Sequence, residues 1–314
     1  MSPDTADGSR LKSSREGKNP LQLVSRATYL KEVALKNLFL LCACVAVAGV
    51  VLIFAFVGLR GWPAFAEVGV WNFLSGSEWS SSTGEFGIWP LIYGSIVVMA
   101  GALALGTPLA VGTAIFLSEI ATPRVRGIVR PAVELLAGIP SVIYGFFGLL
   151  ILRPIVAQLS DGLGFGAVTA WIILAIMIVP TIATLSEDAL RSIQPGIREA
   201  SYAMGATQWQ TIYKVLVPAA KIGIIDAIIL GMGRAIGETM AVLMVVGNAP
   251  YIPASFTEPI ATLTTQIVMD MPYAAGLHRT ALFGMAIILF VVSMALVALV
   301  RLVSRFQTSM DSGR

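Results

Sequence analysis

The chain has 314 residues, of which 56% are hydrophobic and 12% are charged, whereas about 25% of residues are charged in an average soluble domain. Its mean hydropathy is +0.82. This composition excludes an ordinary soluble globular protein, and it predicts an integral membrane protein.

Residues 1–36 are polar and mixed in charge, so this segment is expected to be cytoplasmic and largely disordered. Six apolar runs follow it. A bilayer core about 30 Å thick requires roughly 20 apolar residues per helix, whereas the strands of a membrane barrel would alternate apolar and polar residues. We therefore expect an all-α membrane domain over residues 37–303, a cytoplasmic tail over 304–314, and helices near residues 37–59, 91–117, 133–152, 167–185, 222–246 and 281–300.

The distribution of basic residues predicts the orientation of these helices. Lys and Arg residues near helix ends remain on the cytoplasmic side. Seventeen of the 21 basic residues lie before the first helix, between helices two and three, between helices four and five, or after the last helix. Three lie in the opposite loops, namely Arg60, Arg153 and Arg279. We therefore expect a multi-pass protein of the inner or plasma membrane, with both termini in the cytoplasm.

The sequence offers little material for catalysis. Cys42 and Cys44 lie about 200° apart around one helix, which favours plain packing residues. With His278 as the single histidine, no His/Cys cluster has the spacing of a metal site. Gly17-Lys18 lacks the remainder of a phosphate-binding loop. We expect a chain that is not an enzyme and that binds no cofactor itself, so that any ATP is bound elsewhere.

The fifth apolar run contains the basic residue Arg234 near its middle. A central Arg costs roughly 2.5 to 3.5 kcal/mol on insertion scales, so such residues normally have a partner or face a wet cavity. Glu238, at i,i+4 on the same helix face, is the expected partner. An Arg guanidinium also matches an oxyanion well. Two interpretations stay open: a translocation pathway for an oxyanion that includes Arg234 and Glu238, or an ion pair that only fixes helix packing.

A polar segment of residues 186–221 separates the fourth and fifth runs. We expect a polar helix over 186–194 with Glu187 and Asp188 in its first turn, then a short helix over 197–204 that Gly205 closes. A second short helix should end at Pro218. This helix-turn-helix indicates a surface for a soluble partner, and an amphipathic pair resting on lipid is the alternative.

The same segment resembles the EAA loop of ABC importer permeases, whose pattern is E-A-A, three residues, G, nine residues, I-x-L-P. The matching residues are Glu199, Ala200, Ser201 in place of Ala, Gly205, Val215 in place of Ile, Val217 in place of Leu, and Pro218. The resemblance implies a type I permease whose short helix around Gly205 is the coupling helix. It also implies that Glu199, Ala200 and Gly205 take part in coupling to an ATPase.

Two further stretches, Glu134–Gly145 and Gly231–Val242, resemble the phosphate permeases, and the run Gly237-Glu-Thr-Met-Ala241 is more similar to the PstC type. The resemblance implies a complex in the lipid bilayer with a second permease of the PstA type, two ATP-binding subunits that hold ATP and Mg, and an extracytoplasmic phosphate-binding protein. No nucleic acid is expected. A permease of the same class for sulfate or molybdate is the alternative. A secondary transporter is a further alternative, although it would not need the 186–221 segment and often shows internal repeats.

Overall fold

The computed structural model describes residues 26–160 and 162–311, and it describes side chains for residues 31–160 and 162–302. The chain divides into two compact units, Met1–Ala55 and Phe56–Arg314. Disorder is expected over residues 1–36, and residues 1–25 of this range lie outside the described residues. Residues 26–36, in contrast, form the start of helix α1 (Arg26–Val68). This stretch contains Ala, Leu, Lys and Glu, which are good helix formers.

The part of α1 in the first unit exposes its described side chains. Every side chain from residue 31 to residue 55 is exposed, and the most apolar window of this helix has a mean hydropathy of 3.0 with 0% of it buried. A helix that is apolar on all sides must be covered by lipid or by another chain. The exposed apolar surface of α1 is therefore that of a membrane-spanning helix.

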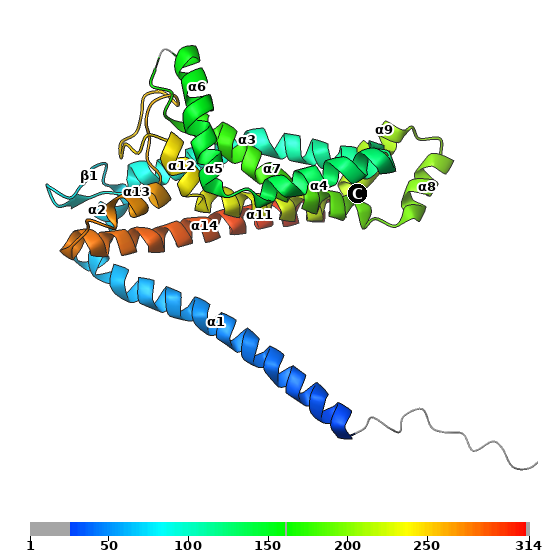
Figure 1. Cartoon of the computed structure of the whole chain (residues 1–314), viewed down its shortest axis with the longest axis horizontal. Coiled ribbons are helices and arrows are strands. Elements are labelled where there is room, and N and C mark those ends of the chain that lie inside the picture. The colour runs from blue at the N-terminus through cyan, green and yellow to red at the C-terminus, as the bar shows by residue number, and fades with distance from the viewer. Residues whose placement is uncertain (1–25, 161, 312–314) are drawn as a thin grey trace, which may run out of the picture. The chain divides into compact units, whose positions relative to one another are not determined.

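Helices also dominate the second unit, which Figure 1 shows together with α1. Two short strands, β1 (Trp79–Ser80) and β2 (Glu85–Phe86), form an antiparallel hairpin in which Trp79 is opposite Phe86. The helices, in chain order, are α2 (Val70–Ser75), α3 (Trp89–Ile115), η1 (Phe116–Ile120), α4 (Pro123–Gly138), α5 (Ser141–Phe147), η2 (Gly148–Leu152), α6 (Arg153–Ser160), α7 (Ala167–Arg191), α8 (Pro195–Ala203), α9 (Gln208–Thr211), η3 (Ile212–Leu216), α10 (Val217–Ala219), α11 (Lys221–Gly237), α12 (Met240–Val245), α13 (Leu263–Asp270) and α14 (Gly276–Asp311).

Five helical stretches of the described chain are long and apolar enough to cross a membrane. A sixth is reached if the bent pair Gln208–Ala219 and Lys221–Gly237, whose helices meet at 68°, counts as one span. The predicted all-α membrane fold is confirmed. The five stretches are Lys31–Val68, Trp89–Ile120, Ser141–Ser160, Ala167–Arg191 and Gly276–Leu302.

The third predicted helix, residues 133–152, is wrong as a single element. Helix α4 ends at Gly138, and a new helix begins at Ser141. Ile139 is extended, with φ −70° and ψ 128°, because a residue that precedes proline is sterically disfavoured in the helical region. Pro140 therefore divides this apolar run, and the stretch long enough to span continues to Ser160.

Helices α3 and α7 pack closely together in the core of the second unit. Gly101 faces the ring of Trp171, and a Cβ on Gly106 would lie 2.8 Å from a side-chain carbon of Ile178. Small residues at these positions let the two helices approach closely, as is usual between membrane helices. The hairpin, α2 and α6 lie at one end of this unit, and α8 and α9 lie at the other (Figure 1).

Candidate functional site: the break between α11 and α12 and the α8–α10 segment

Arg234 lies in the last turn of α11 and is half-buried. Its guanidinium donates a hydrogen bond from Nη1 to Oγ1 of Thr181 on α7, at 3.4 Å. A cation in the last turn of a helix also interacts favourably with the carbonyl end of the helix dipole. The arginine is thus placed where an apolar helix ends inside the bundle.

The fifth predicted helix, residues 222–246, is also wrong as a single element, because it breaks at Glu238. Glu238 is extended, with φ −70° and ψ 125°, so the i,i+4 relation to Arg234 is lost. The Glu238 carboxylate instead accepts a hydrogen bond from the backbone N–H of Ala241 at 3.3 Å. The described residues do not include the expected ion pair between Arg234 and Glu238, and the Glu238 carboxylate is bonded to the first turn of α12 instead.

The glycines of α11 have two different environments. A Cβ on Gly231 would lie 2.6 Å from the Ile182 side chain, so Gly231 permits close packing of α11 on α7. A Cβ on Gly233 or on Gly237 would meet nothing within 4 Å. The face that carries Gly233 and Gly237 is therefore open, and it adjoins the break that follows Arg234.

Gly205 closes α8 as predicted. Its φ is +83°, a conformation that glycine adopts without steric cost. The N–H of Gly205 donates to the carbonyl of Tyr202 at 2.9 Å, and the N–H of Ala206 donates to that of Ser201 at 3.2 Å. These two bonds make the Schellman motif that ends many helices. Gly205 is exposed, and a Cβ on it would meet nothing within 4 Å.

The α8–α10 segment, residues 195–219, is anchored on one side and exposed on the other. Ile212 and Leu216 are buried against Ala114 of α3 and Leu190 of α7. A capping box of Thr207 and Gln210 starts α9. The exposed large hydrophobic side chains are Ile197 at 40%, Tyr202 at 46%, Met204 at 88%, Trp209 at 67% and Tyr213 at 77% exposure.

The residues that carry the EAA resemblance lie on this segment. Glu199 and Ala200 are exposed on α8. Ser201, which stands where the pattern has a second Ala, is half-buried, and its hydroxyl lies 2.9 Å from that of Thr211 on α9. This hydrogen bond joins the two short helices. The structure thus places Glu199, Ala200 and Gly205 together on one exposed segment, and it places Arg234 and Glu238 elsewhere, at the α11–α12 break.

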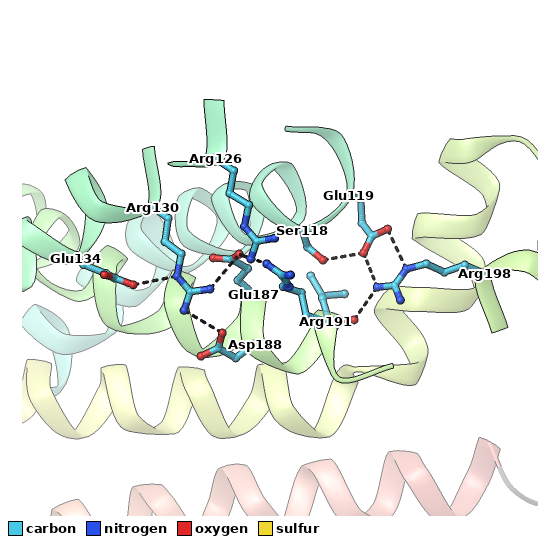
Figure 2. Close-up of polar contacts among 10 residues, drawn as sticks. Ser118, Glu119, Arg126, Arg130, Glu134, Glu187, Asp188, Arg191 and Arg198 are labelled. Carbon is cyan, nitrogen blue, oxygen red and sulfur yellow. Dashed lines mark hydrogen bonds and ion pairs between the residues drawn. The ribbon is translucent and has the colours of Figure 1, made fainter. Parts of the chain in front are cut away.

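Arg198 immediately precedes the exposed Glu199, but its side chain points toward the membrane helices. Its guanidinium donates to both carboxylate oxygens of Glu119 at the end of η1, with distances of 2.8 and 3.2 Å. The same group donates to the backbone carbonyls of Leu190 at 2.9 Å and Ile193 at 3.0 Å. Figure 2 shows Arg198 reaching from α8 toward Glu119. The hydrogen bond to Glu119 raises the pKa of Arg198 above its ordinary value, so this residue stays charged.

Glu187 is the centre of a second ionic cluster. Its side chain is 0% exposed, and its Oε1 lies 2.5 Å from Arg126, 3.4 Å from Arg130 and 3.7 Å from Arg191. Arg130 also contacts Asp188 at 3.2 Å. These residues join α4 to the end of α7 (Figure 2). The prediction that Glu187 and Asp188 begin a separate polar helix is wrong, because α7 continues without interruption to Arg191.

Sequence reasoning did not identify Glu119, Arg198 and Glu187 as site residues. One local signal was available: Arg126, Arg130 and Glu134 recur every four residues, which places them on one face of a helix. Their tertiary partners on α7, and the pairing of Glu119 with Arg198 across 79 positions of sequence, have no local signal. In the part of the chain with described side chains, no three His, Cys, Asp or Glu residues gather in a way that would hold a metal ion.

Replacing Glu187 by Ala should lower the free energy of unfolding by about 1.5–3 kcal/mol, because Arg126 and Arg130 would lose charge-assisted hydrogen bonds to a buried carboxylate. Thermal unfolding of the purified protein in detergent, followed by circular dichroism, measures this change. Asp188→Ala is the matched control, since Asp188 is 57% exposed and contacts Arg130 at the surface. That control should cost less than about 1 kcal/mol. Equal losses of unfolding free energy in both variants would contradict the view that Glu187 is the central residue of this ionic cluster.

The comparisons with known proteins agree with this fold. A family model described as "Binding-protein-dependent transport system inner membrane component" matches residues 106–308. A chain of a bacterial alginate ABC transporter superposes with a TM-score of 0.62, at 18% identity, over 88% of this chain and 97% of that chain. A chain of the MetNI methionine ABC transporter, in an inward-facing conformation, gives a TM-score of 0.50 at 25% identity, over 69% of this chain and 94% of that chain.

Curated relatives are similar over most of the chain. The "Probable ABC transporter permease protein YqgH" of Bacillus subtilis is 40% identical, over 88% of this chain and 91% of that protein. The "Phosphate transport system permease protein PstC" of Mesorhizobium japonicum is 35% identical, over 76% of this chain and 80% of that protein. The chain therefore belongs to the family of binding-protein-dependent transport system inner membrane components, and it is a multi-pass permease of the ABC importer class.

Proposed function

We propose that this chain is one of two permease chains of an ATP-driven importer that moves inorganic phosphate into the cell. The assignment of phosphate as the substrate rests on the similarity to PstC proteins. Among them are those of Mesorhizobium japonicum at 35% and Pasteurella multocida at 34% identity. A permease for sulfate or molybdate would share this fold. Arg234 would not distinguish these ions from phosphate, because a single arginine recognises negative charge and not the central atom of the oxyanion. The substrate must therefore be tested directly.

The α11–α12 break supports a role for Arg234 in the pathway. The arginine is half-buried, its described hydrogen bond to Thr181 is a weak one at 3.4 Å, and the adjoining glycine face is open. A guanidinium in that setting retains donors for the oxygens of a phosphate ion. The open face would be covered by the second permease chain, so that phosphate passes between the two chains. Glu238 would accept the hydrogen bond of a protonated phosphate oxygen or lower the affinity of the site, so that the ion leaves.

The α8–α10 segment supports docking of an ATPase. Its exposed Tyr202, Met204, Trp209 and Tyr213 are large side chains of the kind enriched at interfaces. Its buried face is fixed to α3 and α7. We propose that this segment is cytoplasmic, as are both termini, and that Glu199, Ala200 and Gly205 lie in the contact with the ATPase.

The remaining partners follow from this proposal. Two ATP-binding subunits would hold ATP and Mg, so this chain itself would catalyse nothing. A second permease of the PstA type would complete the membrane part. A phosphate-binding protein would deliver the ion at the opposite end of the bundle, where the hairpin, α2 and α6 lie. ATP binding would then shift the docked segments and, with them, the membrane helices.

The substrate is tested by uptake of labelled orthophosphate in cells that lack their own high-affinity uptake system and express all four kinds of subunit. We expect ATP-dependent uptake that a large excess of sulfate or molybdate leaves unchanged and that unlabelled phosphate abolishes. A catalytically inactive ATPase serves as the control. Uptake of sulfate or molybdate, with no uptake of phosphate by the assembled complex, would overturn the phosphate assignment and leave the importer class intact.

A further inference from the structure

One guanidinium connects the α8–α10 segment to two membrane helices. Arg198 lies in the first half of α8, and it contacts Glu119 at the end of the α3–η1 span. It also contacts the backbone carbonyls of Leu190 and Ile193, where α7 ends. Those carbonyls would otherwise lack intrahelical partners. A single side chain therefore fixes α8 to both the α3–η1 span and α7.

This connection is largely shielded from solvent. The side chain of Glu119 is 8% exposed and that of Arg198 is 22% exposed. Glu119 is held further by a hydrogen bond from the Ser118 hydroxyl at 2.7 Å. Hydrogen bonds between charged groups are shorter and stronger than those between neutral groups, and a two-donor Arg–carboxylate pair has a defined geometry. The pair is therefore a rigid contact and not a transient surface one.

The second short helix is fixed to the same residue. Gln208, at the start of α9, donates from Nε2 to the backbone carbonyl of Glu119 at 3.0 Å. The hydroxyl contact between Ser201 and Thr211 then joins α8 to α9. Both short helices consequently contact Glu119, one through its side chain and the other through its backbone. The α8–α10 segment is therefore attached to residue 119 at two points.

Two adjacent residues of α8, Arg198 and Glu199, differ in their surroundings. Glu199 is exposed and available to a partner, whereas Arg198 is turned toward the permease body (Figure 2). The cluster around Glu187 is different, because its described contacts join α4 to α7 and do not include α8, α9 or α10. That cluster holds the bundle together, and the Arg198–Glu119 pair holds the α8–α10 segment to the bundle.

We propose that Arg198 and Glu119 are positioning residues for energy coupling: their ion pair makes α3 and α7 move with the α8–α10 segment. The proposal rests on the proposed docking of an ATPase on that segment. Without the pair, the ATPase would still bind the exposed side chains and hydrolyse ATP. The α8–α10 segment would then move with the ATPase, but α3 and α7 would not follow it.

The test uses the complete transporter in proteoliposomes and measures ATP hydrolysed per substrate ion transported. Arg198→Gln and Glu119→Gln should each raise this ratio by roughly 5- to 150-fold, the range of a typical energetic coupling between two sites. The amount of ATP-binding subunit that co-purifies should stay at the wild-type level. Because the two residues act as one contact, the double variant should be no worse than the more affected single variant.

Glu134→Gln is the matched control. It removes one negative charge from the chain, but Glu134 is 51% exposed and contacts Arg130 on its own helix. Its ratio should equal that of the wild type. Arg198→Lys keeps the charge and loses the fork of donors, so it should give an intermediate ratio even if the Gln variants do not assemble.

Two results would overturn the proposal. A wild-type ratio in assembled complexes of Arg198→Gln, or of Arg198→Lys if the Gln variant does not assemble, would show that the pair does not transmit movement. Effects of the two Gln variants that multiply in the double variant would show that the residues act independently. Failure of the wild-type chain to bind any ATP-binding subunit would instead refute the proposed docking, so the two failures are distinguishable.

Discussion

Replacing Arg234 by Gln should reduce substrate uptake by roughly 10- to 100-fold while the transporter still assembles. A hydrogen bond to a charged group contributes about 1.5–3 kcal/mol, and each 1.4 kcal/mol changes a rate or an affinity tenfold. Gln keeps the apolar stem of the side chain as far as Cδ, and the hydrogen bond to Thr181 that it would lose is a weak one at 3.4 Å, so packing around α7 and α11 should change little. The loss would therefore fall on transport and not on folding.

The measurement is initial uptake of labelled phosphate, with complex assembly checked by co-purification of the ATP-binding subunit. Arg234→Lys keeps the charge without the two-donor geometry, so it should retain part of the activity. Thr181→Val removes the hydrogen-bond partner of Arg234 at nearly constant volume and should have a small effect. Normal uptake by Arg234→Gln would refute a role in the pathway and would favour the packing interpretation of this arginine.

Replacing Gly205 by Val should uncouple ATP hydrolysis from transport. The φ of +83° at this position costs a non-glycine residue roughly 1–2 kcal/mol, and a β-branched side chain adopts it least readily. The Cβ itself would enter open space. We therefore expect the bundle to fold, while the turn between α8 and α9 changes shape and the exposed side chains on either side of it are displaced.

Uptake and ATPase activity, measured in the same proteoliposomes, test this expectation: uptake should fall at least tenfold relative to ATP hydrolysis, as is typical of a lost coupling contact. Gly205→Asn is the matched control, because Asn tolerates positive φ. A small loss in the Asn variant would assign the effect to backbone shape, and an equal loss in both would assign it to side-chain bulk. Wild-type coupling in the Val variant would count against a docking role for this turn.

Local features of the sequence were sufficient for much of the fold. Apolar runs of spanning length predicted a helical membrane protein, and the glycine at position 205 predicted the end of α8. These predictions are confirmed because both depend on short-range physics, namely hydrophobic length and the backbone freedom of glycine. Membership of the ABC importer permeases, suggested by the EAA resemblance, is confirmed by the family match. The roles of Glu199, Gly205 and Arg234 stay predictions.

Two breaks within apolar runs were predicted less well. Pro140 interrupts the third run for a steric reason that the sequence contains, but Ser141–Ser160 then extends beyond the predicted end. The break at Glu238 has no proline, and hydropathy alone gave no reason to divide residues 222–246. In the structure, the carboxylate of Glu238 accepts from the N–H of Ala241 in the first turn of α12, and its backbone carbonyl accepts from the Thr264 hydroxyl on α13 at 3.3 Å. Contacts with other elements thus stabilise this break.

The sequence by itself determined that this protein lies in a membrane, that it is helical, and that one polar segment with a glycine-closed helix projects from the bundle. Each of these properties depends on composition or on neighbours within one helical turn. Only the tertiary structure decided that Glu187 is buried among three arginines and that Arg198 pairs with Glu119. The partners in these pairs lie on different helices, and the energy of a charge pair depends on distance and burial in space, which spacing along the chain does not specify.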